Sequence, residues 1–273
     1  MSDEFQIYIL GSGSGGNSSV LAFDDTSGHR RLIQIDLGLG PRTCAARAQE
    51  LGFNIDRVEA AIITHGDSDH ITATWGRTFA RREIPVYVTD PHINAVLRAG
   101  IPERCIQRLC QSASITDDLT VHTATSPHDR EGSASLRFDL HTQDLKLAWL
   151  TDLGRVLPAV ETLIDGCDAI AIESNYDLEM QKCSPRPLFL KERIMGGAGH
   201  LSNTEALDAV MRLDADRPLS RVVLLHLSRE CNCPHLLRSL WEREAPSLAD
   251  RLSIAHQATP LGPISVAVAL PMS

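Results

Sequence analysis

The stretch Thr64-His65-Gly66-Asp67-Ser68-Asp69-His70 follows the apolar run Ala60-Ala61-Ile62-Ile63. The small and β-branched residues of that run predict a buried strand, Gly66 predicts a tight turn, and a helix is expected from Ile71 onward. Four of the six residues after Thr64 have side chains that can bind metal: His65, Asp67, Asp69 and His70. A strand end fixes the backbone while the loop lets these side chains converge on one point, as a divalent ion requires. A polar helix cap is the plainer alternative, but a cap needs only one such residue.

The bulk composition suits one globular domain spanning residues 1–273. Hydrophobic residues make up 43% and charged residues 22% of the chain, which is ordinary for a globular protein. The N-terminus has no basic region followed by an apolar stretch, and no segment approaches the roughly 18 apolar residues of a membrane span. We therefore expect no secretory signal, no membrane contact and a cytoplasmic location. The oligomeric state cannot be predicted.

The cysteines and the charges exclude some classes of protein. Seven scattered cysteines argue against a disulfide framework, and Cys231-Asn232-Cys233 is expected to carry reduced thiols near a loop-to-helix junction, with a structural zinc as the alternative. A net charge of −9 disfavours a nucleic-acid binder that relies on bulk electrostatics. Arg186, Lys191 and Arg193 form a local basic stretch, or simply a solvated helix face.

Short strands and helices alternate in both halves of the chain. Strands are expected at residues 6–10, 19–23, 32–36, 60–64, 120–125, 134–140 and 146–151, and helices at 41–51, 72–82, 91–99, 158–163 and 204–213. This order suits two sheets packed face to face with helices outside. Periodicity alone predicts only a mixed α/β protein.

Five motifs in order along the chain resemble those of the metallo-β-lactamase superfamily. The stretch quoted first is similar to that superfamily's H-x-H-x-D-H motif, with Asp67 in place of the second His. The other four are Ile33-Gln34-Ile35-Asp36-Leu37-Gly38, Ser126-Pro127-His128-Asp129, Leu150-Thr151-Asp152 and Leu224-Leu225-His226-Leu227-Ser228. The resemblance implies an α/β (α+β) fold, a four-layer αβ/βα sandwich.

The resemblance also implies a centre of two divalent metal ions. The first ion would be held by His65, Asp67 and His128, and the second by Asp69, His70 and His226, with Asp152 bridging both. Asp36 would orient a ligand histidine by hydrogen bonding. Plainer roles remain open for four of these residues: a turn for Asp36, a surface loop for His128, a strand-end cap for Asp152 and a satisfied buried imidazole for His226.

Asp67 is the departure from the motif, and it has a chemical consequence. A carboxylate is a hard, anionic donor that suits manganese or magnesium, whereas imidazole suits zinc, iron and nickel. We expect zinc, manganese or iron, with the first site shifted toward manganese or iron or weakened for zinc. If the shorter Asp67 side chain does not reach the ion, only the second site fills.

Bound divalent ions would make the chain a hydrolase. A metal-bridged water ionises near pH 7, and two ions roughly 3.5–4 Å apart stabilise the developing oxyanion. Three further segments, at residues 10–19, 172–177 and 199–203, resemble the YycJ (WalJ) branch of the superfamily, bacterial proteins regarded as DNA exonucleases. This implies a phosphodiesterase or nuclease that cleaves DNA from the 5′ end through a metal-activated hydroxide, with nucleic acid as a transient partner.

Asp69, Glu173 and His200 are the catalytic residues implied by this resemblance. Gly199-His200-Leu201-Ser202 also resembles a motif of tRNase Z-type nucleases, in which a His donates a proton to the leaving oxygen. Glu173 could fix the tautomer of His200 and raise its pKa. Alternatively, His200 and Asn203 merely cap the helix that begins near Thr204. The Gly/Ser-rich segment Gly11–Ser19 either presents backbone N–H groups to a phosphate or is only a mobile hairpin.

Two other functions remain open. A small-molecule hydrolase (a cyclic phosphodiesterase, lactonase or thioesterase) would use the same metals without needing His200. A metal-impaired member, spoiled by Asp67, would be a binding or regulatory module. β-Lactamase activity is not expected, because the chain shows no export signal. The last thirty or so residues are left unassigned.

Overall fold

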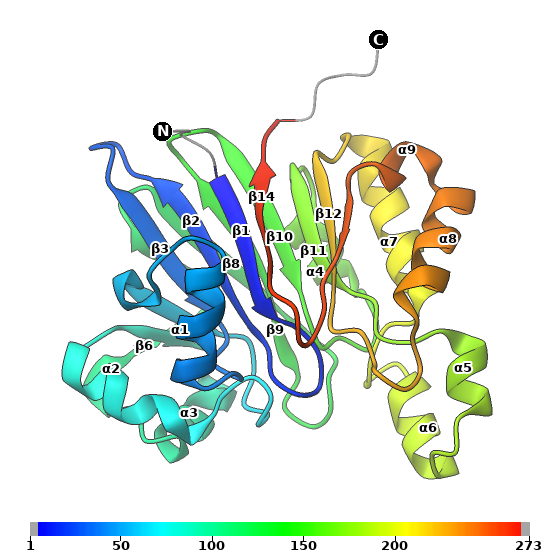
Figure 1. The fold of residues 1–273 in the computed structure, drawn as a ribbon, viewed down its shortest axis with the longest axis horizontal. Helices are drawn as coiled ribbons and strands as arrows, with labels where there is room; N and C mark the ends of the chain where they lie inside the picture. The colour runs from blue at the N-terminus through cyan, green and yellow to red at the C-terminus, as the bar shows by residue number, and fades with distance from the viewer. Residues whose placement is uncertain (1–4, 269–273) are drawn as a thin grey trace.

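Two seven-stranded β-sheets face each other in the computed structural model, which describes residues 5–268 apart from the side chain of residue 216 (Figure 1). In the order of their neighbours, the first sheet contains β14 (Leu261–Val266), β1 (Phe5–Gly11), β2 (Ser18–Asp24), β3 (Arg30–Ile35), β4 (Ala60–Ile63), β5 (Val86–Val88) and β6 (Ile106–Arg108). The second contains β13 (Leu252–Ile254), β12 (Arg221–Leu225), β11 (Ala169–Glu173), β10 (Leu145–Leu150), β9 (Ser133–Leu140), β8 (Leu119–Ser126) and β7 (Ser112–Thr116). Predictions that concern residues 1–4 and 269–273 lie outside the described residues.

Helices cover the outer face of each sheet (Figure 1). The first sheet is covered by α1 (Pro41–Glu50), α2 (Gly76–Arg82) and α3 (Ile93–Arg98), and the second by α4 (Pro158–Ile164), α7 (Asn203–Asp216) and α8 (Pro234–Glu244). Three further helices are α5 (Leu178–Cys183), α6 (Leu188–Met195) and α9 (Pro246–Ala249). The predicted helix–sheet–sheet–helix sandwich is therefore confirmed.

Strand β1 shows why the two sheets must be covered on both faces. Phe5, Ile7 and Ile9 pack into the core between the sheets, while Tyr8 and Leu10 pack into the core under α1. Alternate side chains of a strand point to opposite faces, so a strand with apolar residues on both faces needs two partners. Layers of helix outside and sheet inside supply them.

Each sheet changes from antiparallel to parallel pairing partway across. Strands β3 to β6 pair in parallel in the first sheet, and strands β10 to β13 do so in the second. Parallel strands end at the same edge of a sheet, and loops at such carboxyl ends commonly form binding sites. The motif at residues 64–70 and the segments after β10, β11 and β12 all lie at these ends.

The expected elements are present, and the largest boundary error is at the start of α2. The helix expected from Ile71 begins only at Gly76, after a 3₁₀ turn at Ala73–Trp75. The intervening chain is extended because it pairs with the continuation of β3: the Leu37 N–H donates to His70 O at 2.7 Å, and the Thr72 N–H donates to Leu37 O at 3.1 Å. The long-range pairing overrides the local helical pattern.

The unassigned C-terminal segment completes both sheets. β13 pairs with β12, and β14 pairs antiparallel with β1 at the edge of the first sheet. Within residues 5–268 all seven cysteines are free thiols, and Cys231 and Cys233 lie directly before α8, as predicted. No helix in the described range is long and apolar enough to cross a membrane.

Candidate metal centre

Loops from both sheets converge on one open basin of about 390 Å³. From the first sheet come Asp36, directly after β3, and residues 65–70, after β4. From the second come His128 between β8 and β9, Asp152 after β10, Glu173 at the end of β11 and His226 directly after β12. The structure thus brings together all the residues predicted for the site, although they are spread over most of the chain.

Three of these residues have a left-handed backbone conformation. Asp36, Asp152 and His226 have φ angles of 58°, 54° and 54°. Such angles are rare for residues other than glycine and cost of order 1–3 kcal/mol each. Each residue lies at a strand end, where this sharp turn directs its side chain into the site rather than along the strand. Backbone strain concentrated at strand ends around one basin indicates a functional constraint.

Asp36 holds the ring of His70 in one orientation. Its Oδ2 lies 2.7 Å from Nδ1 of the fully buried His70, and its Oδ1 accepts the Thr64 N–H at 2.9 Å. The other ring nitrogen, Nε2, lies 2.9 Å from Oδ2 of Asp152 and 2.8 Å from Nδ2 of Asn17. Burial alone would lower the pKa of His70, but Asp152 and Asp36 raise it well above its usual value. Asp36 lies where its expected orienting role requires.

Two groups of donors could each hold one metal ion. Ligand atoms of His65, His128 and Asp152 lie within 4.8 Å of one another, and so do those of Asp69, His70 and His226. Nε2 of His65 is buried and, among the described residues, makes no hydrogen bond. A buried polar atom without a partner is costly, and an ion held by His65, His128 and Asp152 would satisfy it. The donor set therefore fits divalent metal.

Asp67 reaches the first group of donors. Its side chain is 53% exposed at the mouth of the basin, and its Oδ2 lies 3.8 Å from His65 Nε2 and 3.9 Å from His128 Nε2. The nearby His128 imidazole lowers the pKa of Asp67 to about 2, against the opposing effect of burial. A permanently anionic oxygen thus faces the same point as the two imidazoles, so its short side chain is no bar to binding.

Carboxylates dominate the electrostatics of the site. Burial would lower the pKa of His128, but Asp67 and Asp152 raise it to about 9. Burial would likewise lower the pKa of His226, but Asp152 and Asp69 raise it to about 10. Surplus negative charge of this kind favours a bound cation.

Glu173 links the metal donors to His200. Glu173 is fully buried; its Oε2 accepts the Asp152 N–H at 2.7 Å, and its Oε1 accepts the Leu201 N–H at 2.9 Å. Nδ1 of His200 lies 3.1 Å from Oε1 of Glu173. Burial would raise the pKa of Glu173, but His200 and His226 lower it. A carboxylate partner makes Nδ1 the protonated nitrogen of His200, which leaves Nε2 for a substrate.

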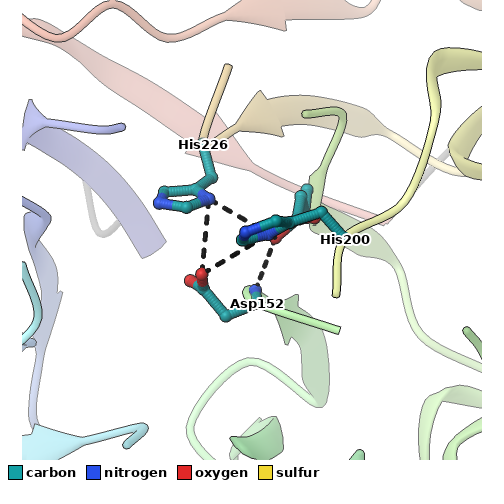
Figure 2. Close-up of side chains that lie close together, drawn as sticks. Asp152, His200 and His226 are labelled. Atoms are coloured by element: carbon teal, nitrogen blue, oxygen red, sulfur yellow. Dashed lines mark hydrogen bonds and ion pairs between the residues drawn. The ribbon is translucent and has the colours of Figure 1, made fainter. Parts of the chain in front are cut away.

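His200 also lies beside the metal donors (Figure 2). Its Nδ1 is 3.7 Å from Oδ1 of Asp152, and its ring centroid is 5.3 Å from that of His226. His200 is not the cap of α7, because Ser202 caps that helix in a reciprocal pair with Glu205. The capping alternative is therefore wrong for His200, whose 20% exposed side chain lines the basin.

Asn17 is a site residue that the sequence interpretation missed. Its Oδ1 accepts the Gly13 N–H at 2.8 Å, its backbone N–H donates to Asp69 O at 2.7 Å, and its carbonyl accepts the Gly38 N–H at 2.9 Å. Through its side chain and its backbone, this one residue joins the Gly/Ser-rich segment to two motif loops. An asparagine closing a glycine-rich turn was the available signal, since its amide can both donate and accept.

The Gly/Ser-rich segment is not a free phosphate cradle. Besides the Gly13 N–H held by Asn17, the Gly15 N–H donates to Gln257 Oε1 at 2.6 Å and the Gly16 N–H donates to Gly13 O at 3.0 Å. Three amides of the segment are thus used within the protein. Gln257, in the C-terminal stretch that the sequence left unassigned, braces this loop beside the basin.

A buried amide network, also missed, fixes the second half of the site. Asn232 Nδ2 donates to Ser174 O at 2.8 Å and to Asn175 O at 3.0 Å, and Asn203 Nδ2 donates to Asn232 Oδ1 at 3.1 Å. Asn175 Nδ2 in turn donates to the carbonyl of His226 at 2.8 Å. The network joins the ends of β11 and β12 to the start of α7. It thereby fixes the positions of Glu173, His226 and His200 relative to one another.

Comparisons with known proteins agree with this geometry. The chain is 29% identical to the protein named exodeoxyribonuclease YycJ of Bacillus anthracis over 235 residues, covering 84% of this chain and 85% of that one. It is 27% identical to exodeoxyribonuclease WalJ of Streptococcus pneumoniae, covering 85% of each. A solved diphosphatase of the PhnP family superimposes with a TM-score of 0.64 at 16% identity, covering 94% of this chain and 96% of that one, and so shares the fold.

The family match covers the donor cluster itself. The family described as the beta-lactamase superfamily domain matches residues 31–227, a span that runs from β3 to just past His226. With its clustered histidines and aspartates, that fold indicates that the chain binds divalent metal. The resemblance to the metallo-β-lactamase superfamily, and to its YycJ-like branch, is thus supported by sequence, fold and site together. The chain belongs to the beta-lactamase superfamily domain family.

Proposed function

We propose that the protein is a metal-dependent phosphodiesterase that degrades DNA as a 5′ exonuclease. The pairing of Glu173 with His200 beside the metal donors carries the proposal. Cleaving a phosphodiester leaves an alkoxide, and a histidine held by a carboxylate is suited to protonate it. Hydrolysis of an activated ester or a lactone needs no such acid. The two exodeoxyribonucleases similar over about 85% of their length support the same substrate class.

The proposed site uses each residue for one task. His65, Asp67, His128 and Asp152 would hold one ion, and Asp69, His70 and His226 the other, with Asp152 between them. Ions held there would supply an activated water near pH 7 and stabilise negative charge on the phosphate. Asp36 keeps the His70 ring in place, and Glu173 keeps Nε2 of His200 available to the leaving oxygen. Arg186 and Arg193 line the basin, where they attract the DNA backbone.

The donor at position 67 sets the proposed metal preference of the first site. A carboxylate at position 67 favours manganese or iron over zinc at the first site, relative to an imidazole there. Because Asp67 faces both His65 and His128, we propose that the protein binds two ions and is not a metal-impaired member of the superfamily. We treat residues 1–273 as one functional domain, since both halves supply donors. Action on DNA makes the cytoplasm the expected location.

The first experiment offers the metal-reconstituted protein a 5′-phosphorylated duplex DNA labelled at each end, with Mn²⁺ or Zn²⁺. Stepwise shortening from the 5′ end, lost in Asp152→Ala, supports the proposal. Asp117→Ala removes the same charge at an exposed turn and serves as the control. Intact DNA with both ions contradicts the proposal and favours a small-molecule ester or cyclic phosphodiester.

His200 can be tested separately from the metals. We expect His200→Ala to lower the rate of DNA cleavage by about 10²- to 10⁴-fold, the usual contribution of a general acid. The same variant should lose much less of its rate of bis(p-nitrophenyl) phosphate hydrolysis, because the p-nitrophenolate leaving group departs without protonation. Equal losses on both substrates, with metal content unchanged, would show that His200 is not the acid.

A further inference from the structure

Phe189 is unusual among the aromatic side chains of this protein. The sequence holds six Phe, three Tyr and three Trp, all within the described residues. Phe189 alone among them is strongly exposed, at 71%, and its neighbour Leu188 is 70% exposed. Most large apolar side chains are buried on folding, so an exposed apolar pair that includes an aromatic ring indicates an interaction site.

The position of Phe189 relates it to the basin. Phe189 lies in α6, which projects with α5 below the lower edge of the second sheet (Figure 1). Leu190 and Arg193 of the same helix line the basin. Residues four apart on a helix are neighbours on its surface, so Phe189 lies one turn from Arg193, on the rim.

The helix that carries Phe189 is anchored. Ile194 of α6 is 8% exposed and packs with Tyr176 and Cys231 in a small separate core. Arg193 pairs with Asp129, its Nε donating to Oδ1 at 2.8 Å, across the mouth of the basin. The ring is therefore presented from a fixed support rather than from a free loop, which lowers the entropic cost of binding through it.

Two cationic side chains lie on the side of the basin nearest Phe189. Arg186 and Arg193 both line the basin on the side of α6. The Arg186 Nε donates to Glu230 Oε2 at 3.0 Å, and the Glu230 side chain is 66% exposed, so a phosphate can compete for this guanidinium. Proteins that hold single strands combine such a charged groove with aromatic rings on which bases stack. Two exposed apolar side chains are too few for a stable protein interface.

We propose that Phe189 is a stacking platform for an unpaired base of the DNA strand whose phosphodiester enters the basin. Arg186 and Arg193 would contact the phosphates on either side of that base. The inference rests on the proposed function and adds to it a substrate feature: the strand must be unpaired where it crosses α6. Single-stranded or frayed ends should therefore bind better than a blunt duplex.

The test measures binding to the metal-loaded protein carrying His200→Ala, in which cleavage is too slow to intervene. Fluorescence anisotropy compares an oligothymidylate with an abasic strand of equal length and charge. We expect Phe189→Ala to weaken oligothymidylate binding about 10- to 100-fold, the range of base–aromatic stacking, and to leave abasic-strand binding unchanged. Phe189→Trp should restore the affinity, and its fluorescence should be quenched by oligothymidylate but not by the abasic strand. Leu236→Ala, at an exposed apolar residue of α8, is the control.

The outcomes separate this inference from the proposed function. If the unaltered protein degrades DNA but Phe189→Ala binds oligothymidylate equally well, the stacking platform is wrong and the nuclease stands. If the unaltered protein with its metals neither binds nor cleaves DNA, the proposed function itself fails. The alternative occupant of the surface around Phe189 is a second copy of the chain, which light scattering tests for. A dimer that Phe189→Ala converts to a monomer would identify this surface as a dimer contact and overturn the inference.

Discussion

Gly38 occupies a position where no side chain fits. A Cβ there would lie 1.7 Å from the backbone oxygen of Asp69 and 2.7 Å from the backbone N of Asn17. These are backbone atoms of the site loops, which cannot move aside without displacing the metal donors. We expect Gly38→Ala to reduce bound metal, measured by mass spectrometry after dialysis, by well over half, and activity in parallel.

Gly40 provides the matched control for that substitution. It lies two residues further on, has a φ of −68°, and an added Cβ would meet only Thr74 Oγ1 at 3.6 Å, an ordinary contact. Gly40→Ala should therefore keep its metal, at a cost in stability of a few tenths to about 1 kcal/mol as a helix cap. Full metal retention by Gly38→Ala would show that the two loops are looser than their packing indicates.

The cysteines should differ sharply in reactivity. Burial raises the pKa of Cys44 to about 11 and that of Cys167 to about 12, whereas Cys110 and Cys183 are exposed. The thiolate is the reactive form, so at pH 8 the first two are both shielded and protonated. We expect Ellman's reagent to titrate Cys110 and Cys183 rapidly in the native protein, and all seven cysteines only in denaturant. Rapid labelling of Cys167 at pH 8 would contradict the structure.

Single residues of the site differed in how well the sequence could predict them. His65 to His70 were predictable because their donors share one strand end, so their spacing alone brings them together. Glu173 and His200 needed a family resemblance, since 27 residues separate them and only the pairing of whole strands makes them neighbours. Asn17 was not predicted as a site residue because it acts through hydrogen bonds to backbone groups of loops far along the chain. Such contacts leave no periodic pattern.

At the scale of elements, the contribution of β14 to the stability of the fold can be tested. It closes the edge of the first sheet against β1, and its Ile264 is 6% exposed and packs into the core between the sheets. We expect Ile264→Ala to lower the free energy of unfolding by about 2–4 kcal/mol, the usual cost of removing a buried isoleucine side chain. Urea denaturation followed by circular dichroism measures it.

Val268, two residues beyond β14, is the comparison. Its side chain is 53% exposed, so Val268→Ala should change the free energy of unfolding by less than about 0.5 kcal/mol. If both variants unfold at the same urea concentration as the unaltered chain, the C-terminal strand contributes little, and β1 would be a tolerated free edge.

Element prediction succeeded where strands were long and apolar. The segments at 6–10, 19–23 and 134–140 became β1, β2 and β9 with their ends moved by a residue or two. β5, β6 and β7 were missed because they are only three to five residues long, too short for a periodic signal, and β6 and β7 are largely polar or exposed. Their strand geometry comes from pairing with a neighbour, which local sequence does not encode.

At the scale of the whole molecule, the metal donors bridge the two halves of the sandwich. His65, Asp67, Asp69 and His70 follow β4 of the first sheet, whereas His128, Asp152 and His226 belong to the second. The family resemblance predicted both the sandwich and its donors, because strand-end motifs determine where each donor is placed. The residues alone could not show that donors from the two sheets lie side by side at one edge of the sandwich. That arrangement depends on how β3 and β10 pack across the core.

Ions that join the two halves should stabilise the whole protein. A ligand present at about 1,000 times its dissociation constant adds about 4 kcal/mol to the free energy of unfolding, or roughly 8–16 °C in a chain of this size. We expect EDTA treatment to lower the melting temperature by about this amount, measured by calorimetry, and Mn²⁺ or Zn²⁺ to restore it. Asp152→Ala should lose the metal-dependent increment, while Asp117→Ala, at an exposed turn outside the site, should keep it. A melting temperature indifferent to metal would mean that the folded protein does not bind these ions appreciably, and the two-ion assignment would have to be abandoned.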